Sequence, residues 1–198
     1  MTIKTNLKTI LLNAILFMAI TTVAVSCDMG SKGEDTKDIA EEHNDAKFNS
    51  TNKEEDAKFL VSAAEINLEE IQLGILAQQK SKLKSVTDLG KMMEEGHNKL
   101  MTELTDLAAM KVISIPSTYT EKAMESMKKL STMTGKDFDK LYSKMTVDNH
   151  TNAVSIYEKA STNAADSEIM EWALKSLPIL RTHLDHAITC QKECEQSN

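Results

Sequence analysis

Four long stretches of this chain repeat apolar side chains at the spacing of one face of an α-helix. We place them at about residues 57–80, 83–111, 137–164 and 166–194. Little interrupts them, because the 198 residues include only 2 prolines and 6 glycines. Amphipathic helices of this length bury their apolar faces most economically against one another. The expected fold is therefore all-α, a four-helix bundle.

A short extra helix is expected in the connection between the second and third long helices. Thr118 and Glu121 have the spacing of a capping box, in which each side chain binds a free backbone amide at the start of a helix. Gly135 then ends this helix. Asp166 or Ser167 is expected to cap the last long helix.

The expected core consists mainly of aliphatic and methionine side chains, because aromatic residues make up only 4% of the chain and there are 12 methionines. The inward-facing residues of the four stretches, in chain order, are Phe59, Ala63, Ile66, Leu73 and Ala77; Val86, Leu89, Met93, Leu100, Leu104 and Leu107; Phe138, Leu141, Tyr142, Met145, Ala153, Ile156 and Ala160; and Ile169, Trp172, Ala173, Leu177, Leu180, Leu184 and Ala187.

The amino-terminal segment has the features of a secretory signal. Lys4 and Lys8 precede an apolar run from about Ile10 to Val25, and the run is too short for a stable membrane span. Small residues stand directly before Cys27, an arrangement that resembles the lipobox of bacterial lipoproteins. This resemblance implies a signal peptide over residues 1–26 and an acylated Cys27, carrying palmitate or related chains, as the new amino terminus. An ordinary signal peptide with an incidental cysteine is the alternative.

The expected domain organisation follows from composition. Residues 27–55 are acidic and polar and bury too little apolar area to offset the entropy of ordering, so we interpret them as a flexible tether. A docked extension of the domain is the alternative. Residues 56–198 are long enough for one helical domain.

Charge and cysteine content limit the partners. The formal net charge is -7, and removal of residues 1–26 takes away two lysines and no acids. Such an acidic protein has no electrostatic reason to bind nucleic acid, so we expect no nucleic-acid partner. With Cys27 acylated, Cys190 and Cys194 remain, and a bridge between residues four apart on a helix is strained. Two free thiols are as consistent with the sequence as this bridge, and so are cross-links to a partner.

Several polar residues fall on the apolar stripes. A functional site, if the domain has one, is expected at such polar residues in core positions. Glu70 lies in the first stripe, Glu94 and His97 in the second and His183 in the fourth, while His150 lies on the flank of the third. Carboxylate and imidazole together suit iron, manganese, zinc or copper. We therefore name Glu70, Glu94, His97 and His183 as candidate metal ligands, and His150 as a weaker one. For Glu70 and His97, a structural hydrogen-bonded pair is the favoured interpretation and the metal site is the alternative. Motifs for a catalytic nucleophile or a phosphate-binding loop are missing from the sequence, so no catalytic residue is assigned.

The order of several short motifs resembles one bacterial family. These motifs are residues 56–59 and 70–77, then 92–97, then 145–150, and finally 177–184, which contains Pro178 and His183. Together they resemble the domain-of-unknown-function family numbered forty-one forty-two, whose members are often labelled as outer-membrane proteins. The resemblance covers about residues 56–188. It implies a ferritin-like bundle in the bacterial envelope and no established activity. A complete di-iron site is not expected, because Leu180 stands three residues before His183, where ferritin-like metal proteins have glutamate.

These observations lead to two functional expectations. The first is a non-enzymatic envelope lipoprotein, a binding or stress-related module anchored to the membrane through lipid on Cys27, with the outer membrane favoured over the inner. Its partners would be another envelope protein or a second copy of the chain. The second is a metal-binding bundle that holds iron, zinc or copper, with redox activity as an option.

Overall fold

The computed structural model describes residues 34–196, and these residues form six α-helices and no β-strand. The helices are α1 (Thr36–Lys47), α2 (Thr51–Lys80), α3 (Lys84–Lys111), α4 (Glu121–Ser131), α5 (Gly135–Asn163) and α6 (Ser167–Gln196). The all-α prediction is therefore confirmed for this part of the chain. The signal segment and Cys27 lie outside the described residues, so what was predicted for them stays a prediction.

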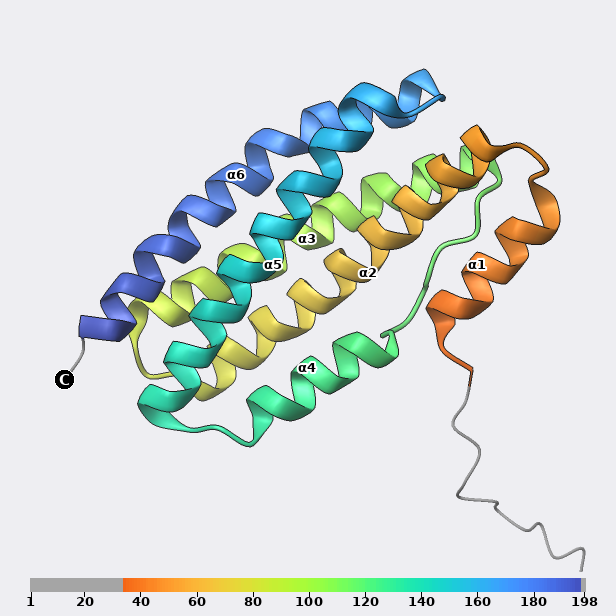
Figure 1. Cartoon of the computed structure of the whole chain (residues 1–198). Coiled ribbons are helices and arrows are strands. Elements are labelled where there is room, and N and C mark those ends of the chain that lie inside the picture. Colours follow the sequence, from red (N-terminus) through yellow and green to blue (C-terminus); the bar gives the residue numbers. More distant parts are fainter. Residues whose placement is uncertain (1–33, 197–198) are drawn as a thin grey trace, which may run out of the picture. The chain divides into compact units, whose positions relative to one another are not determined.

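The four long helices α2, α3, α5 and α6 enclose one core (Figure 1). The closest pairs are α2 with α3 and α5 with α6, and further contacts join α2 to α5 and α3 to α6. Helix α4 packs against α2 and α5, and α1 packs against α2. Each long helix therefore contributes its buried side to the same interior, where side chains from all four meet.

Two helix starts show which capping residues the chain uses. The prediction that Thr118 caps the short helix is wrong, because Thr120 is the N-cap of α4 and its hydroxyl accepts from the backbone N–H of Ala123 at 3.3 Å. Thr120 is fully buried, so its hydroxyl is held at the helix start while Thr118 stays exposed. At α6 the carboxylate of Asp166 accepts from the N–H groups of Glu168 and Ile169, so Asp166 is the capping residue there.

The segment expected to be a flexible tether contains a docked helix, α1. The side-chain amide of Asn44 is buried and pairs twice with Ser114: its Nδ2 donates to the Ser114 carbonyl and its Oδ1 accepts from the Ser114 N–H, both at 2.8 Å. Lys37 forms an ion pair with Glu65 of α2 at 3.0 Å. The segment has little apolar area to bury, but polar contacts to residues far along the chain order it as a docked extension of the domain.

The core divides into two apolar clusters with a polar layer between them. One cluster gathers around Phe59, Tyr157 and Trp172, whose rings contact one another. The other gathers around Phe138 and Tyr142. The buried polar residues that lie between the two sets along each long helix are Asn67, Glu69 and Glu70 on α2, His97 on α3, Ser143, Thr146 and His150 on α5, and His183 on α6. A polar layer in mid-core is costly unless its groups bind one another or a ligand.

Helices α2 and α3 approach closely at two facing glycines. A Cβ atom on Gly74 would lie 2.5 Å from the Gly90 carbonyl oxygen, and one on Gly90 would lie 2.7 Å from the Gly74 carbonyl oxygen. Only glycine at both positions allows this backbone contact. The contact brings α2 within hydrogen-bonding reach of α3 in the polar layer one to two turns away.

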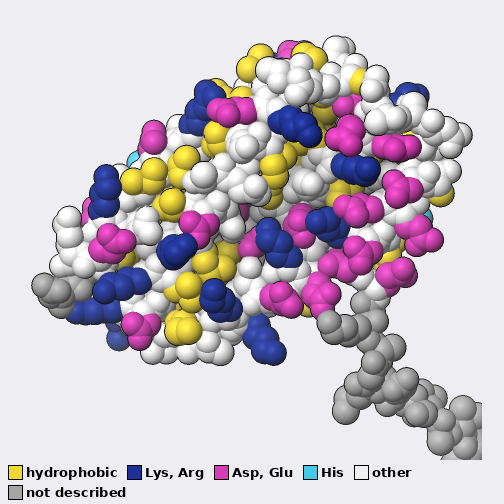
Figure 2. Space-filling view, in the orientation of Figure 1, with side chains coloured by type: hydrophobic (Ala, Val, Ile, Leu, Met, Phe, Trp, Pro, Cys, Tyr) yellow, Lys and Arg dark blue, Asp and Glu magenta, His cyan; other side chains and the backbone are white. Residues whose placement is uncertain are grey.

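The surface is charged, and hydrophobic side chains are scattered over the face shown in Figure 2 among Lys, Arg, Asp and Glu. The large hydrophobic residues that the described part exposes are Met110, Val112, Tyr119, Met124 and Leu174. Among the described residues, none of the helices has the length and apolar character needed to cross a bilayer.

Candidate metal centre

Three histidines from three different helices meet in the polar layer of the core. His97 lies on α3, His150 on α5 and His183 on α6. Each can offer one ring nitrogen so that the three nitrogens lie within 4.8 Å of one another, and the ring centroids are 5.2 to 5.4 Å apart. Their relative exposures are 0%, 0% and 4%. We call these residues the histidine triad.

The outer nitrogens of two triad rings are held by hydrogen bonds. His97 Nδ1 lies 2.9 Å from the side-chain oxygen of Asn67, and His150 Nδ1 lies 2.9 Å from the backbone carbonyl of Thr146. The Thr146 carbonyl can only accept, so His150 Nδ1 carries the proton and donates it. With the Asn67 amide oriented as in the structure, where its Nδ2 has no partner, His97 Nδ1 donates in the same way. In a neutral imidazole the other nitrogen is then a bare lone pair.

The two bare nitrogens face each other. His97 Nε2 and His150 Nε2 are 3.1 Å apart. With both ring protons on the Nδ1 side, no proton lies between them, and this contact joins two acceptors. Facing acceptors in a dry core are unfavourable, whereas a metal ion between them would bind both. An N–H donated outward to a carbonyl or amide oxygen is also the usual support of a metal-binding histidine.

His183 completes the triad from α6. Its Nδ1 is buried and has no hydrogen-bond partner. Its ring lies against Gly96 of α3, where a Cβ atom would come within 2.4 Å of Cε1 and 2.6 Å of Nε2. Any side chain at position 96 would displace the ring, so Gly96 makes the room that His183 occupies.

All three rings are held neutral. Burial lowers the pKa of His97 well below its ordinary value, and the neighbouring rings of His150 and His183 lower it further. Burial lowers the pKa of His150 to about 4, against the opposing effect of the bond to Thr146. The pKa of His183 falls to about 3, mainly through burial and then through His150 and His186. Neutral rings are the form that binds a metal, so protons compete weakly at neutral pH.

The two candidate glutamates lie outside this group. Glu70 is fully buried on α2, and its Oε1 accepts from Asn149 Nδ2 at 2.8 Å while Oε2 has no partner. Burial raises the pKa of Glu70 to about 8, so this side chain is mostly protonated at neutral pH. Glu94 is half-buried, and its carboxylate accepts from Gln78 at 2.7 Å.

Of the five candidate ligands, the structure thus brings together His97, His150 and His183, and leaves Glu70 and Glu94 apart. Sequence reasoning gave His150 the least weight, because it lies at the edge of its stripe. It also missed Asn67, which orients His97. Asn67 stands four residues after Ala63, a residue of the apolar stripe, and this spacing on one helix face was the available signal.

The two cysteines of the described chain, Cys190 and Cys194, are buried free thiols one turn apart on α6. Burial, with Cys194 nearby, raises the pKa of Cys190 to about 12. Burial also raises the pKa of Cys194. Both thiols therefore stay protonated at neutral pH, and no disulfide joins them in the structure.

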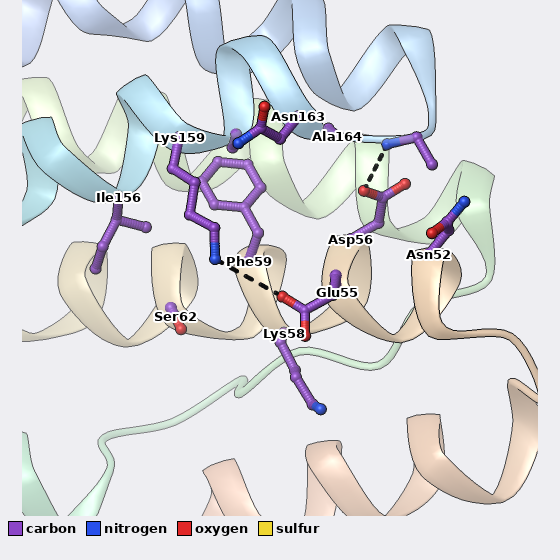
Figure 3. Close-up of a pocket in the computed structure, with 12 residues that line it drawn as sticks. Asn52, Glu55, Asp56, Lys58, Phe59, Ser62, Ile156, Lys159, Asn163 and Ala164 are labelled. Carbon is purple, nitrogen blue, oxygen red and sulfur yellow. Dashed lines mark hydrogen bonds and ion pairs between the residues drawn. The ribbon is translucent and has the colours of Figure 1, made fainter.

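A larger hollow lies away from the triad, between the first turns of α2 and the end of α5 (Figure 3). Its volume is about 490 Å³, and Phe59 and Ile156 form part of its wall. Asp56 ties the neighbouring turn in place by accepting from the N–H groups of Ala165 and Asp166. The lining includes no histidine or cysteine, so this hollow does not extend the candidate metal centre.

The fold and the triad define an all-α domain with a three-histidine centre that could hold a metal ion. The family model described as "Domain of unknown function (DUF4142)" matches residues 41–189, and the chain belongs to this family. The match spans all three triad histidines. No curated protein and no solved structure matches the chain.

Proposed function

We propose that this protein is a metal-binding module of the bacterial envelope, in which the histidine triad holds one zinc- or copper-class transition metal ion. The observation that carries the proposal is the convergence of three buried imidazoles from three helices, whose ring nitrogens lie within 4.8 Å of one another, with His97 Nε2 and His150 Nε2 3.1 Å apart. The proton of His150 is committed to the Thr146 carbonyl, so His150 Nε2 is an unprotonated nitrogen that faces the His97 ring inside the core.

The spacing of the triad suits a single ion. Metal–imidazole bonds of about 2.0–2.1 Å in tetrahedral geometry hold ligand nitrogens about 3.3 Å apart. The nitrogens of His97 and His150 are already close to this separation, and all three lie within 4.8 Å of one another. Small side-chain rotations would bring the third ring into place. Three protein ligands would leave one position of the ion open.

The donor set favours binding over oxygen chemistry. Di-iron bundles use bridging glutamates from several helices, and here Glu70 and Glu94 bind Asn149 and Gln78 instead. Three neutral imidazoles suit zinc and copper. We therefore assign the triad to holding a single metal ion rather than to di-iron chemistry, with the open position available to a further ligand.

We further propose a ferritin-like architecture for the domain and a lipid anchor at Cys27. Four long helices with a ligand-bearing layer in mid-core support the first. The basic start, the apolar run and the small residues before Cys27 support the second. Cells that express the full chain should incorporate labelled palmitate, and Cys27→Ala should abolish it. Label retained in that variant would refute the anchor.

Metal content tests the triad. The purified full chain should retain or take up about one ion per chain, measured by plasma mass spectrometry after dialysis. His97→Ala, His150→Ala and His183→Ala should each lower the content at least tenfold, a loss expected for removal of a ligand. His43→Ala is the control, because His43 is exposed on α1. Circular dichroism confirms that each variant is folded. Unchanged binding in the three triad variants would refute the proposal.

A further inference from the structure

Three surface hollows meet at one methionine side chain. Met92 lines a hollow of about 430 Å³ with Gly96 and His183, and another of about 340 Å³ with Pro178, Thr182 and His183. It also lines a third, of about 190 Å³. Met92 itself is partly buried, so its thioether stands between solvent and the core.

Two of these hollows reach the triad from outside. Both include His183, which is the only triad residue with measurable exposure, at 4% against 0% for the other two. Met92 and Gly96 are four residues apart on α3 and therefore lie on the same face of that helix. Gly96 has no side chain to cover the His183 ring. The surface of α3 at Met92 and Gly96 is thus an opening to the metal centre.

The donors at this opening are soft. A methionine thioether is a soft ligand that suits Cu(I), whereas the usual protein ligands of zinc are Cys, His, Asp and Glu. The third hollow, which Met92 also lines, adds a thiol and an imidazole from Cys190 and His186. Asp88 and Glu95 also line the hollow that reaches Gly96, and each is paired with a lysine, Lys84 and Lys91 respectively.

The charge of the site also favours a monovalent ion. The triad is a fully neutral donor set in the dry core, and among the described residues no carboxylate joins it. Moving an ion from water into a poorly polarisable interior costs free energy that rises steeply with ionic charge. A divalent ion would enter without a compensating anionic ligand, whereas Cu(I) carries half that charge and is stable with three nitrogen ligands.

We propose that the ion held by the triad is Cu(I), and that it enters at Met92, whose thioether binds it first and passes it to His183. This rests on the proposed function of the triad and adds the identity of the ion and its route. The transfer is a ligand exchange: the Cu(I)–sulfur bond is replaced by a Cu(I)–nitrogen bond, and the copper keeps its oxidation state.

Two measurements on the full chain test this proposal under anaerobic conditions. In the first, Cu(I) and Zn(II) compete for the triad, with Cu(I) supplied as its bicinchoninate complex. We expect Cu(I) to displace bound Zn(II), and the reverse displacement not to occur. In the second, the rate of Cu(I) uptake is compared between the wild type and Met92→Leu. This substitution keeps the side-chain volume but removes the sulfur.

Met92→Leu should slow Cu(I) uptake by about tenfold or more, while the uptake rate of Zn(II) and the affinity for Cu(I) stay within about twofold. A tenfold lower rate corresponds to an increase of about 1.4 kcal/mol in the activation free energy of Cu(I) uptake. Met101→Leu is the matched control, because Met101 is also partly buried on α3 but lines none of the three hollows. It should leave both rates unchanged.

The outcomes separate this inference from the proposed function. If neither ion binds, the metal-binding function itself fails, and this inference fails with it. If the triad binds Zn(II) and Cu(I) cannot displace it, the function stands and the identity of the ion is wrong. If Cu(I) binds but Met92→Leu and Met101→Leu take it up equally fast, the entry route is wrong.

Discussion

Gly96→Ala is the substitution that should separate metal binding from folding. The new Cβ atom would lie 2.4 Å from Cε1 and 2.6 Å from Nε2 of His183. Ordinary contact distances between such atoms are about 3.5–4.0 Å, so the ring must retreat by about 1 Å. A metal–nitrogen bond tolerates a change of about 0.2 Å. The shift is therefore several times larger than the bond allows, and His183 should be lost as a ligand.

The cost to folding should be small. An alanine inside a helix is about 1 kcal/mol more favourable than a glycine. Overpacking a core costs about 1–3 kcal/mol, and here the displaced group is the end of a side chain that can rotate toward the surface hollows. The free energy of unfolding of the metal-free protein should thus change by less than about 2 kcal/mol.

The assay compares metal affinity, by competition with a chromophoric chelator, and unfolding in urea, for the wild type and Gly96→Ala. We expect affinity to fall by about 100-fold, at the upper end of what a disturbed ligand environment costs. Asn98→Ala is the control, because it changes an exposed residue on the same turn of α3 without touching a histidine. Wild-type affinity in a folded Gly96→Ala protein would refute the placement of His183 at the metal.

The burial and bonding of single residues give three further predictions. Because the folded pKa of Glu70 is raised from 4.5 to about 8, the folded state binds more protons than the unfolded state between these values, and stability falls as pH rises through this window. Glu70→Gln should remove this loss. The free energy of unfolding of the variant, measured in urea, should therefore rise relative to that of the wild type from pH 5 to pH 8, by up to about 1.4 kcal/mol per pH unit. Parallel plots of this free energy against pH for the two proteins would contradict the assignment. Metal affinity should stay nearly constant from pH 8 to about pH 5, because the pKa values of His150 and His183 are lowered to about 4 and about 3. A metal affinity that already falls near pH 6.5 in metal titrations would show that the rings are not held neutral. Asn44→Ala should lower the free energy of unfolding by about 1–3 kcal/mol and expose α1 to proteases, because the N–H and carbonyl of Ser114 lose their partner. Asp45→Ala is the control: this residue lies on the exposed side of α1, and its substitution should change neither the stability nor the protease sensitivity.

The long helices could be predicted from the sequence because their periodic apolar stripes are local and uninterrupted. The start of α4 was misplaced by two residues, since Thr118 and Thr120 are both good caps and only tertiary burial selects Thr120. Helix α1 was missed because its stability comes from Asn44, whose partner Ser114 lies 70 residues away, and no local pattern records such a bond.

In the candidate site, too, the sequence predicts features that depend on one helix and misses those that depend on contacts between helices. His97 and His183 fall in the middle of their stripes, so both were expected to point inward. His150 lies at the edge of its stripe, and it is buried because α5 presents it toward two other histidines. The sequence places Glu70 in the core but cannot show that Asn149, the residue before His150, donates a hydrogen bond to it. Spacing along one helix predicts which way a residue faces, but which residues meet depends on how neighbouring helices align.

X-ray absorption spectroscopy of the copper-loaded full chain tests the central claim most directly, because it reports the atoms bound to the ion. The histidine triad predicts three nitrogen neighbours at about 2.0 Å with the multiple scattering that imidazole rings produce. His150→Ala should retain too little copper to give this spectrum. A spectrum dominated by oxygen or sulfur neighbours, or one that His150→Ala leaves unchanged, would show that the metal binds elsewhere.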